Sequence, residues 1–307
     1  MEHKPILVKP ILEALNIKAD GVYVDCTFGR GGHSTEILKR LSSGRLIAID
    51  QDSDAIDSAK NLQKQYPNLT IVHDNFRHLK SILESLDLRS VDGILIDLGV
   101  SSPQFDDEER GFSYRSNHRL DMRMDTRQSL DAYTVVNTYR FEDLFRCLKE
   151  YGEEPYAKQI ARKIEQSRMI KPIETTFELV DVIKSALPSK VLSQKGHPAK
   201  QSFQALRIEV NDELSSLDDV LKQAISALKP DGRLAILSFH SLEDRRVKRV
   251  FLDHCTVFTP KNLPLKDLPK ASYELLTKNA VVADEEERLD NPRSHSAKLR
   301  VLKKVNL

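Results

Sequence analysis

The chain of 307 residues has few cysteines, only Cys26, Cys147 and Cys255. They are odd in number and far apart, which argues against a disulfide framework, and no Cys/His spacing resembles a zinc site. No stretch approaches the roughly 18 apolar residues of a membrane helix. Charged residues interrupt the first 15 positions, where a signal peptide would carry an apolar segment. We therefore expect a cytoplasmic protein with reduced thiols and no bound metal.

The charge is unevenly distributed, although its net value is only +1. Residues 1–110 carry 13 Lys and Arg against 18 Asp and Glu, whereas residues 111–210 carry 17 against 13. Residues 156–207 alone hold ten basic and four acidic side chains. A basic block that follows an acidic one predicts a polyanionic partner. A solvated helix surface would have the same composition, so this alternative stays open.

Short apolar runs alternate with helical patterns in the first 100 residues. This alternation is typical of βαβ units and predicts an α/β fold, a mostly parallel sheet with helices on both faces. A further buried strand follows the breaker sequence Lys-Pro-Asp-Gly near residue 232. The expected strands are 21–26, 44–52, 69–76, 91–99 and 232–239, and the expected helices between them are 32–41, 52–66 and 77–86.

The last two expected strands lie unusually far apart in the chain. From Leu98 to Arg233 there are 134 intervening residues, where one crossover needs about 30. Apolar residues at three- to four-residue spacing from 203 to 228 predict one long crossover helix. Apolar stripes and a capping box at Thr175 and Glu178 indicate further helices before it. We predict a Rossmann-like domain formed by residues 1–105 and 201–307, with an inserted helical domain, 106–200.

The glycine-rich stretch DCTFGRGGHS, residues 25–34, directly follows the first expected strand. A glycine turn at this place in a parallel sheet binds an adenosine-bearing cofactor. Asp50 ends the second expected strand, 21 residues after Gly29, where an acid hydrogen-bonds ribose hydroxyls. NAD and S-adenosylmethionine fit these features equally well, and a glycine turn without a ligand is a third interpretation.

Asp25 distinguishes the two cofactors. Beside a pyrophosphate, its charge would repel by roughly 4 kcal/mol per charge pair at 4 Å, at an effective dielectric constant of about 20. S-adenosylmethionine has no phosphate and carries two cationic groups, an ammonium and a sulfonium. Asp25, Asp50 and Asp97 each close an expected strand, so the acids form a cation-friendly group. These residues favour S-adenosylmethionine.

A short turn after Asp97 indicates which atom receives the methyl group. Ser102-Pro103-Gln104-Phe105 resembles the [Asp/Asn/Ser]-Pro-Pro-[Tyr/Phe] sequence of amino methyltransferases. A side-chain oxygen and a main-chain carbonyl of this turn would accept the two N–H bonds of a poorly nucleophilic exocyclic amine. Phe105 would stack on the base, which is worth about 1–3 kcal/mol. No cysteine lies between residues 27 and 146, which argues against methylation at carbon 5.

Several longer stretches resemble the bacterial 16S ribosomal RNA cytosine-N4 methyltransferases, the RsmH or MraW family. The resemblance implies a class I methyltransferase fold and transfer from S-adenosylmethionine to N4 of cytosine 1402. It implies catalytic roles for Ser102, Pro103 and Phe105, and the small ribosomal subunit as partner. The implied cofactor contacts are Gly31, Gly32, His33, Asp50, Phe76, Asp97 and Gln104. The matching stretches are DCTFGRGGHS, DGILIDLGVSSPQFDDEERGFS, LDMRMD, YGEE, HPAKQSFQALRIEVN, LKPDGRLAILSFHSLEDR and NPRSHSAKLR.

Two rival functions stay open at this point. One is an NAD-dependent oxidoreductase, and the other is an RNA-binding helical module on an inactive Rossmann scaffold. In the inserted domain, Lys158, Arg162, Lys163 and Arg168 lie on or just beyond a predicted helix, and Arg162 and Lys163 point away from its apolar stripe. We expect them to contact the RNA backbone. The sequence does not decide the oligomeric state, and a homodimer is one arrangement that it allows.

Overall fold

The computed structural model describes residues 5–100, 107–256 and 271–306. The chain forms two compact units, one of Met1–Gly99 with Leu214–Leu307 and the other of Val100–Glu213. Both boundaries differ from the predicted domain ranges, and residues 201–213 belong to the second unit instead of the first. Within the described part of the chain, no helix combines the length and apolar character needed to cross a membrane.

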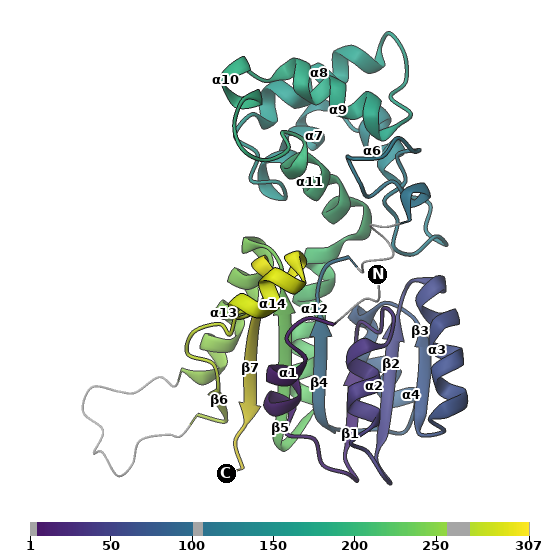
Figure 1. The fold of residues 1–307 in the computed structure, drawn as a ribbon, viewed down its shortest axis with the longest axis vertical. Helices are drawn as coiled ribbons and strands as arrows, with labels where there is room; N and C mark the ends of the chain where they lie inside the picture. Colours follow the sequence, from purple (N-terminus) through teal and green to yellow (C-terminus); the bar gives the residue numbers. More distant parts are fainter. Residues whose placement is uncertain (1–4, 101–106, 257–270, 307) are drawn as a thin grey trace, which may run out of the picture. The chain divides into compact units, whose positions relative to one another are not determined.

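The first unit contains a seven-stranded sheet in the order β3-β2-β1-β4-β5-β7-β6 (Figure 1). The first five strands pair in parallel, whereas β7 is antiparallel to both of its neighbours. The predicted mostly parallel sheet is therefore confirmed, and β6 and β7 were not predicted. The strands are β1 Val22–Asp25, β2 Arg45–Asp50, β3 Leu69–His73, β4 Val91–Asp97, β5 Leu228–Ser238, β6 Tyr273–Leu275 and β7 Lys298–Lys304.

Helices cover both faces of this sheet (Figure 1). On one face, Val24 and Ile47 pack in a core with residues of α4, α12 and α13. On the other face, the adjacent strand residues Tyr23 and Leu46 pack with α1, α2 and α3, because neighbouring strand residues point to opposite faces. The helices of this unit are α1 Val8–Leu15, α2 Gly32–Leu38, α3 Ser53–Gln65, α4 Leu79–Ser85, α12 Glu213–Ala227, α13 Ser241–Cys255 and α14 Glu285–Asp290.

The second unit is helical and has its own apolar core. The predicted capping box is present at the start of α9, where Glu178 N–H donates to the Thr175 hydroxyl at 3.3 Å. The helices are α6 Ala132–Thr138, α7 Phe141–Glu150, α8 Ala157–Arg168, α9 Thr176–Ala186, α10 Ser189–Leu192 and α11 Lys200–Asn211.

The prediction of one long crossover helix is wrong. Helix α11 ends at Asn211, Asp212 adopts the left-handed conformation with φ 47°, and α12 begins at Glu213. A left-handed residue ends a helix because it turns the chain out of the helical path. The apolar spacing continues across this break, so the periodicity could not reveal it.

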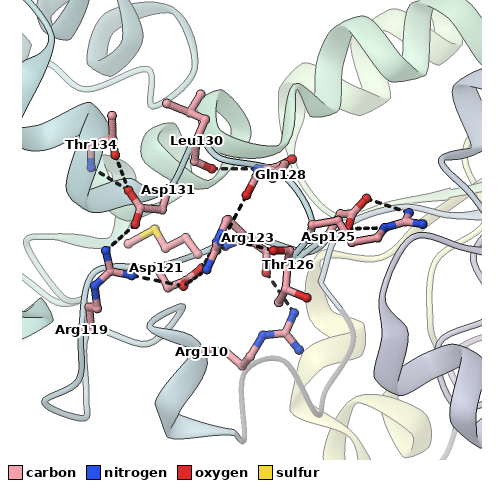
Figure 2. A network of polar contacts seen from close by, with 12 residues as sticks. Arg110, Arg119, Asp121, Arg123, Asp125, Thr126, Gln128, Leu130, Asp131 and Thr134 are labelled. Carbon is pink, nitrogen blue, oxygen red and sulfur yellow. Dashed lines mark hydrogen bonds and ion pairs between the residues drawn. The ribbon is translucent and has the colours of Figure 1, made fainter.

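An arginine–aspartate network holds the segment before α6 in the second unit (Figure 2). The Arg123 guanidinium donates to both Asp121 carboxylate oxygens, at 2.8 and 2.7 Å. It also donates to the main-chain carbonyls of Thr126 and Gln128, at 3.1 and 2.9 Å. Arg110 donates to the carbonyl of Arg123 itself, at 2.9 Å. These bonds fix a segment that forms neither helix nor strand.

Candidate active site

Three aspartates mark one edge of the sheet in the first unit. Asp25, Asp50 and Asp97 are the last residues of β1, β2 and β4. Because these neighbouring strands are parallel, their carboxyl ends meet at the same edge, where α/β sheets bind their ligands. The acidic group expected from the sequence is therefore assembled by the fold.

Asp25 is nearly fully buried, with 1% of its surface exposed. One carboxylate oxygen accepts a hydrogen bond from the Ser34 hydroxyl at 2.7 Å, and the other accepts from the Thr27 N–H at 3.2 Å. Burial raises the pKa of Asp25, and these two hydrogen bonds oppose the rise. Asp25 thus connects β1 to the first turn of α2 and stabilises the glycine loop between them.

The backbone conformation of this loop requires glycine at two positions. Gly29 and Gly31 have φ angles of 57° and 75°, in the left-handed region that glycine adopts most readily. A Cβ atom on Gly31 would also lie 2.6 Å from the Phe28 ring. Gly31 precedes α2, and Gly32 and His33 are the first two residues of that helix. The predicted cofactor residues of the loop therefore lie together at the start of α2.

Asp50 connects the second strand to the same loop. Its carboxylate oxygens accept hydrogen bonds from the N–H groups of Gly29, at 2.7 Å, and Asp52, at 2.9 Å. Burial raises the pKa of Asp50 to about 6, with smaller raising effects from Asp52 and Asp25, against the lowering by the two N–H groups. Asp50 was expected to contact a ribose, and the structure adds that it holds the loop.

Asp97 lies close to His33 and has an unused acceptor. Its carboxylate is 3.6 Å from His33 Nε2, and its N–H donates to the Thr27 hydroxyl at 2.7 Å. Among the described residues, the buried Oδ1 atom of Asp97 has no hydrogen-bond partner. Burial raises the pKa of Asp97 to about 8, and the charges of Asp25 and Glu243 contribute to the rise.

The three carboxyl groups at this sheet edge fit a cationic ligand. Three carboxyl groups with raised pKa values share one sheet edge, so a positive charge there would stabilise their ionised forms. The ammonium and sulfonium of S-adenosylmethionine meet this requirement, and Asp97 Oδ1 is an acceptor that such a cation could use. A pyrophosphate would add negative charge to the group. The site therefore suits S-adenosylmethionine better than NAD.

Glu243 and the role of Thr27 were not predicted from the sequence. Glu243 is 2% exposed and accepts hydrogen bonds from the N–H groups of Phe239 and His240, at 2.8 and 3.2 Å. His240 and Glu243 form the capping box of α13, which begins at Ser241. Asp244, the next residue, pairs with Arg300 at 2.7 Å. The capping box could have been predicted from the sequence, because a glutamate follows His240 by three residues.

The remaining predicted site residues fall into two groups. Phe76 begins a short 3-10 helix, η1 Phe76–His78, and is half-buried just beyond β3. A hydrogen bond of 2.7 Å from the Asn75 amide to the Gln51 side chain connects this segment to the residue after β2. Ser102, Pro103, Gln104 and Phe105 lie outside the described residues.

Asp50→Ala is expected to weaken the binding of S-adenosylmethionine. The carboxylate retains lone pairs for ribose hydroxyls beside its two backbone bonds, and hydrogen bonds to a charged group are worth about 1.5–3 kcal/mol. We expect a loss of affinity of about 10- to 150-fold in isothermal titration. A matched control is Asp57→Ala, since Asp57 is an exposed acid on α3. Unchanged affinity in a folded Asp50→Ala protein would remove Asp50 from the site.

Proteins similar to this chain indicate its family. Two relatives named ribosomal RNA small subunit methyltransferase H, from Streptococcus dysgalactiae subsp. equisimilis and Streptococcus pyogenes, are each 51% identical. Each match covers 99% of this chain and 98% of the relative. A solved rRNA methylase from Streptococcus thermophilus matches with a TM-score of 0.45 and 11% identity, over 100% of this chain and 99% of that one. The model of the MraW methylase family matches residues 1–305, and the chain belongs to this family.

Proposed function

We propose that this methyltransferase modifies the exocyclic N4 amine of cytosine 1402 in 16S ribosomal RNA, with S-adenosylmethionine as cofactor. The observation that carries the proposal is similarity over nearly the whole chain to relatives named ribosomal RNA small subunit methyltransferase H. The acidic edge of the sheet supports it, because a cationic methyl donor suits three buried or half-buried carboxyl groups. NAD and an inactive scaffold are correspondingly disfavoured.

Each site residue has an assigned task in this proposal. When bound, S-adenosylmethionine supplies a methyl group activated by its sulfonium. Asp50 would hold the ribose and Asp97 the cationic end, while the backbone of Gly31 and Gly32 permits close approach, beside His33. Phe76 and Gln104 complete the proposed cofactor contacts.

The proposed catalytic residues act on the amine. Ser102 and a main-chain carbonyl of the Pro103 turn would accept the two N–H bonds, which restores nucleophilicity to the nitrogen. Phe105 would stack on the cytosine ring. These contacts would orient the amine lone pair toward the methyl group that the cofactor supplies; the sulfur would leave as a neutral thioether and the amine proton would pass to solvent.

Nucleosides digested from RNA methylated by the protein are expected to contain N4-methylcytidine. Methylation at carbon 5 requires a thiolate nucleophile. Cys26, the cysteine of the glycine loop, is 1% exposed, and burial raises its pKa well above the ordinary value. Mass spectrometry of the nucleosides distinguishes the two products. Finding 5-methylcytidine would overturn the amine mechanism.

We further propose that helix α8 contacts the RNA backbone. Ile160 and Ile164 are buried in the core of the second unit, whereas Lys158 and Arg162 are exposed and Lys163 is half-buried. The Arg162 guanidinium lies 5.6 Å from the centre of the Phe141 ring. Contacts from lysine and arginine side chains to phosphates position an RNA without reading its sequence.

Replacing Lys158, Arg162 and Lys163 together by glutamine is expected to weaken RNA binding. It should also reduce the salt dependence, by roughly 0.7 in logarithmic slope for each lost single-strand phosphate contact. Fluorescence anisotropy at several salt concentrations measures both quantities. The control is the glutamine triple variant of Lys60, Lys64 and Lys80, which are exposed in the first unit. An unchanged slope for the α8 variant, or an equal loss in the control, would contradict the proposal.

Arg168 does not belong to this surface, although it lies on the same helix. Its guanidinium donates to the main-chain carbonyl of Val136 at 2.7 Å and also to that of Tyr139. Arg168 therefore satisfies carbonyls at the end of α6. Its replacement would test the stability of the unit instead of RNA binding.

Two expectations about assembly and location stay predictions. A homodimer is allowed by the sequence, and sedimentation velocity at micromolar concentration would test it. A cytoplasmic location was expected from the composition, and cell fractionation would test that.

A further inference from the structure

The second unit carries an aromatic pair that the proposed reaction does not use. The rings of Tyr114 and His197 are stacked, with centroids 4.2 Å apart and an angle of 12° between their planes. Tyr114 also meets the Phe203 ring edge-on at 5.6 Å, and Phe203 is 3% exposed in the core. Tyr114 and His197 are themselves half-buried. The pair is thus anchored to the core while part of it faces solvent.

The hydrogen bonding of His197 defines its tautomer. The Ala199 N–H donates to Nδ1 of His197 at 3.3 Å. A nitrogen that accepts a hydrogen bond carries no proton, so the neutral ring carries its proton on Nε2. No hydrogen-bond partner of Nε2 occurs among the described residues. His197 therefore offers a ring face and one N–H donor to a ligand.

Cationic groups surround the pair. Burial lowers the pKa of His197, and the charges of Lys184 and Arg115 lower it further, while no carboxylate of the described residues contributes. The Arg115 guanidinium lies 6.0 Å from the centre of the Tyr114 ring. Lys195 and Lys200, which flank His197 in the sequence, are exposed. In a nucleic acid, an aromatic base is flanked by negatively charged phosphates. The neutral ring of His197 could stack on such a base while the surrounding cations bind the phosphates.

We propose that Tyr114 and His197 form a platform on which an unpaired base of the substrate RNA stacks, with Arg115 and Lys184 at the adjacent phosphates. This inference rests on the proposed function, since it assigns a second base contact to the same RNA. Proteins recognise single-stranded RNA by stacking unpaired bases on aromatic side chains. Each such stack is worth about 1–3 kcal/mol. The alternative is that the pair only packs a loop onto the core.

His197→Ala and His197→Phe separate these two roles. The probe is a single-stranded oligonucleotide of the 16S ribosomal RNA sequence around cytosine 1402, with 2-aminopurine replacing one flanking purine at a time. The protein contains no tryptophan, so the fluorescence of 2-aminopurine is observed against a low background. We expect His197→Ala to weaken RNA binding by about 5- to 150-fold, the equivalent of the stacking contribution. His197→Phe should retain affinity within about threefold and keep the quenching of one 2-aminopurine.

The outcomes distinguish this inference from the proposed function. Wild-type affinity and quenching in His197→Ala would overturn the platform and leave the methyltransferase proposal intact. A wild-type protein that neither binds nor methylates the RNA would overturn both. Affinity for S-adenosylmethionine should not change in either variant.

A measurement on the wild-type protein covers the case in which His197→Ala does not fold. Nuclear magnetic resonance of the His197 ring protons, assigned by comparison with His197→Phe, should show an upfield shift when the RNA is added. The shift arises because a stacked base places its ring current over the histidine. Unchanged His197 resonances under saturating RNA would overturn the platform.

Discussion

Asp97→Asn is expected to stabilise the cofactor-free protein while weakening its binding of S-adenosylmethionine. In the folded protein the pKa of Asp97 is raised to about 8, against 3.8 for an ordinary aspartate. The folded state therefore holds this proton more tightly than the unfolded state. The free energy of unfolding consequently falls as pH rises from about 4 to about 8, because the folded protein must then bury a charge. Asparagine has no proton to lose and avoids this cost.

The stabilising effect of asparagine should therefore grow with pH through the same window. We expect about 1–3 kcal/mol at pH 8 and close to none at pH 4. The full pKa shift would imply more, but the side chain is 28% exposed, and solvent screens part of the effect. Urea unfolding at several pH values measures the difference. Affinity for S-adenosylmethionine should meanwhile fall by about 10- to 150-fold, as for the loss of a charged hydrogen-bond partner.

Asp92 provides a matched control on the same strand. Burial raises its pKa, but hydrogen bonds from Lys229, at 2.7 Å, and the Val22 N–H, at 2.9 Å, outweigh burial and lower the pKa overall. Asp92→Asn should accordingly destabilise the protein at neutral pH, and the difference should shrink as pH falls through the lowered pKa. If both variants change stability in the same direction at pH 8, the charge interpretation of Asp97 is wrong.

Arg123→Ala is expected to destabilise the second unit by about 3–5 kcal/mol. The Arg123 side chain is 21% exposed and donates to Asp121 and two carbonyls (Figure 2). Its removal deprives Asp121, which is 17% exposed, of its nearest cation. Breaking a largely buried ion pair costs this much because a charge loses its close partner, and Arg119, whose guanidinium lies 3.6 Å from Asp121, replaces that partner only in part. Urea unfolding followed by far-ultraviolet circular dichroism measures the loss.

Arg127→Ala is the control that the chain itself offers. Arg127 pairs with Asp125 at the same two-residue spacing, through two hydrogen bonds of 2.8 Å. Its side chain is 53% exposed, and exposed pairs contribute about 0–1 kcal/mol. We therefore expect a small effect from this otherwise similar substitution. Equal losses for the two variants would show that burial and the carbonyl contacts of Arg123 do not matter.

Local sequence patterns were sufficient for most elements of the first unit. The apolar runs that end at Asp25, Asp50 and Asp97 are strands, as predicted. They could be predicted because a short apolar run is recognised from residues that are close together in the sequence. Asp52 accepts from the Asp54 N–H at the start of α3, in the expected helix range. The same holds for the capping box of α9. These signals involve residues at most a few positions apart.

The placement of the acidic residues at one sheet edge was also predictable in outline. Three acids that each end a parallel strand must lie near one another once the strands pair. The sequence could not show that Asp25 binds Ser34, that Asp50 binds the Gly29 N–H, or that Asp97 approaches His33. Those contacts depend on how the loop folds back over the strands. The sequence resemblance named Asp50, Asp97 and His33, a charge argument named Asp25, and the structure explains the raised pKa values of the three aspartates.

The sequence by itself determined the α/β class, the inserted helical segment, the family and the cation-friendly edge of the sheet. Only the tertiary structure decided where α11 ends, because the left-handed Asp212 interrupts the helix without interrupting its apolar spacing. It also decided that Arg123 is largely buried and bound to a half-buried aspartate while Arg127 stays exposed, and that Tyr114 stacks on His197. These outcomes depend on burial and on contacts between distant segments. Neither can be predicted from the periodicity of residues along the chain.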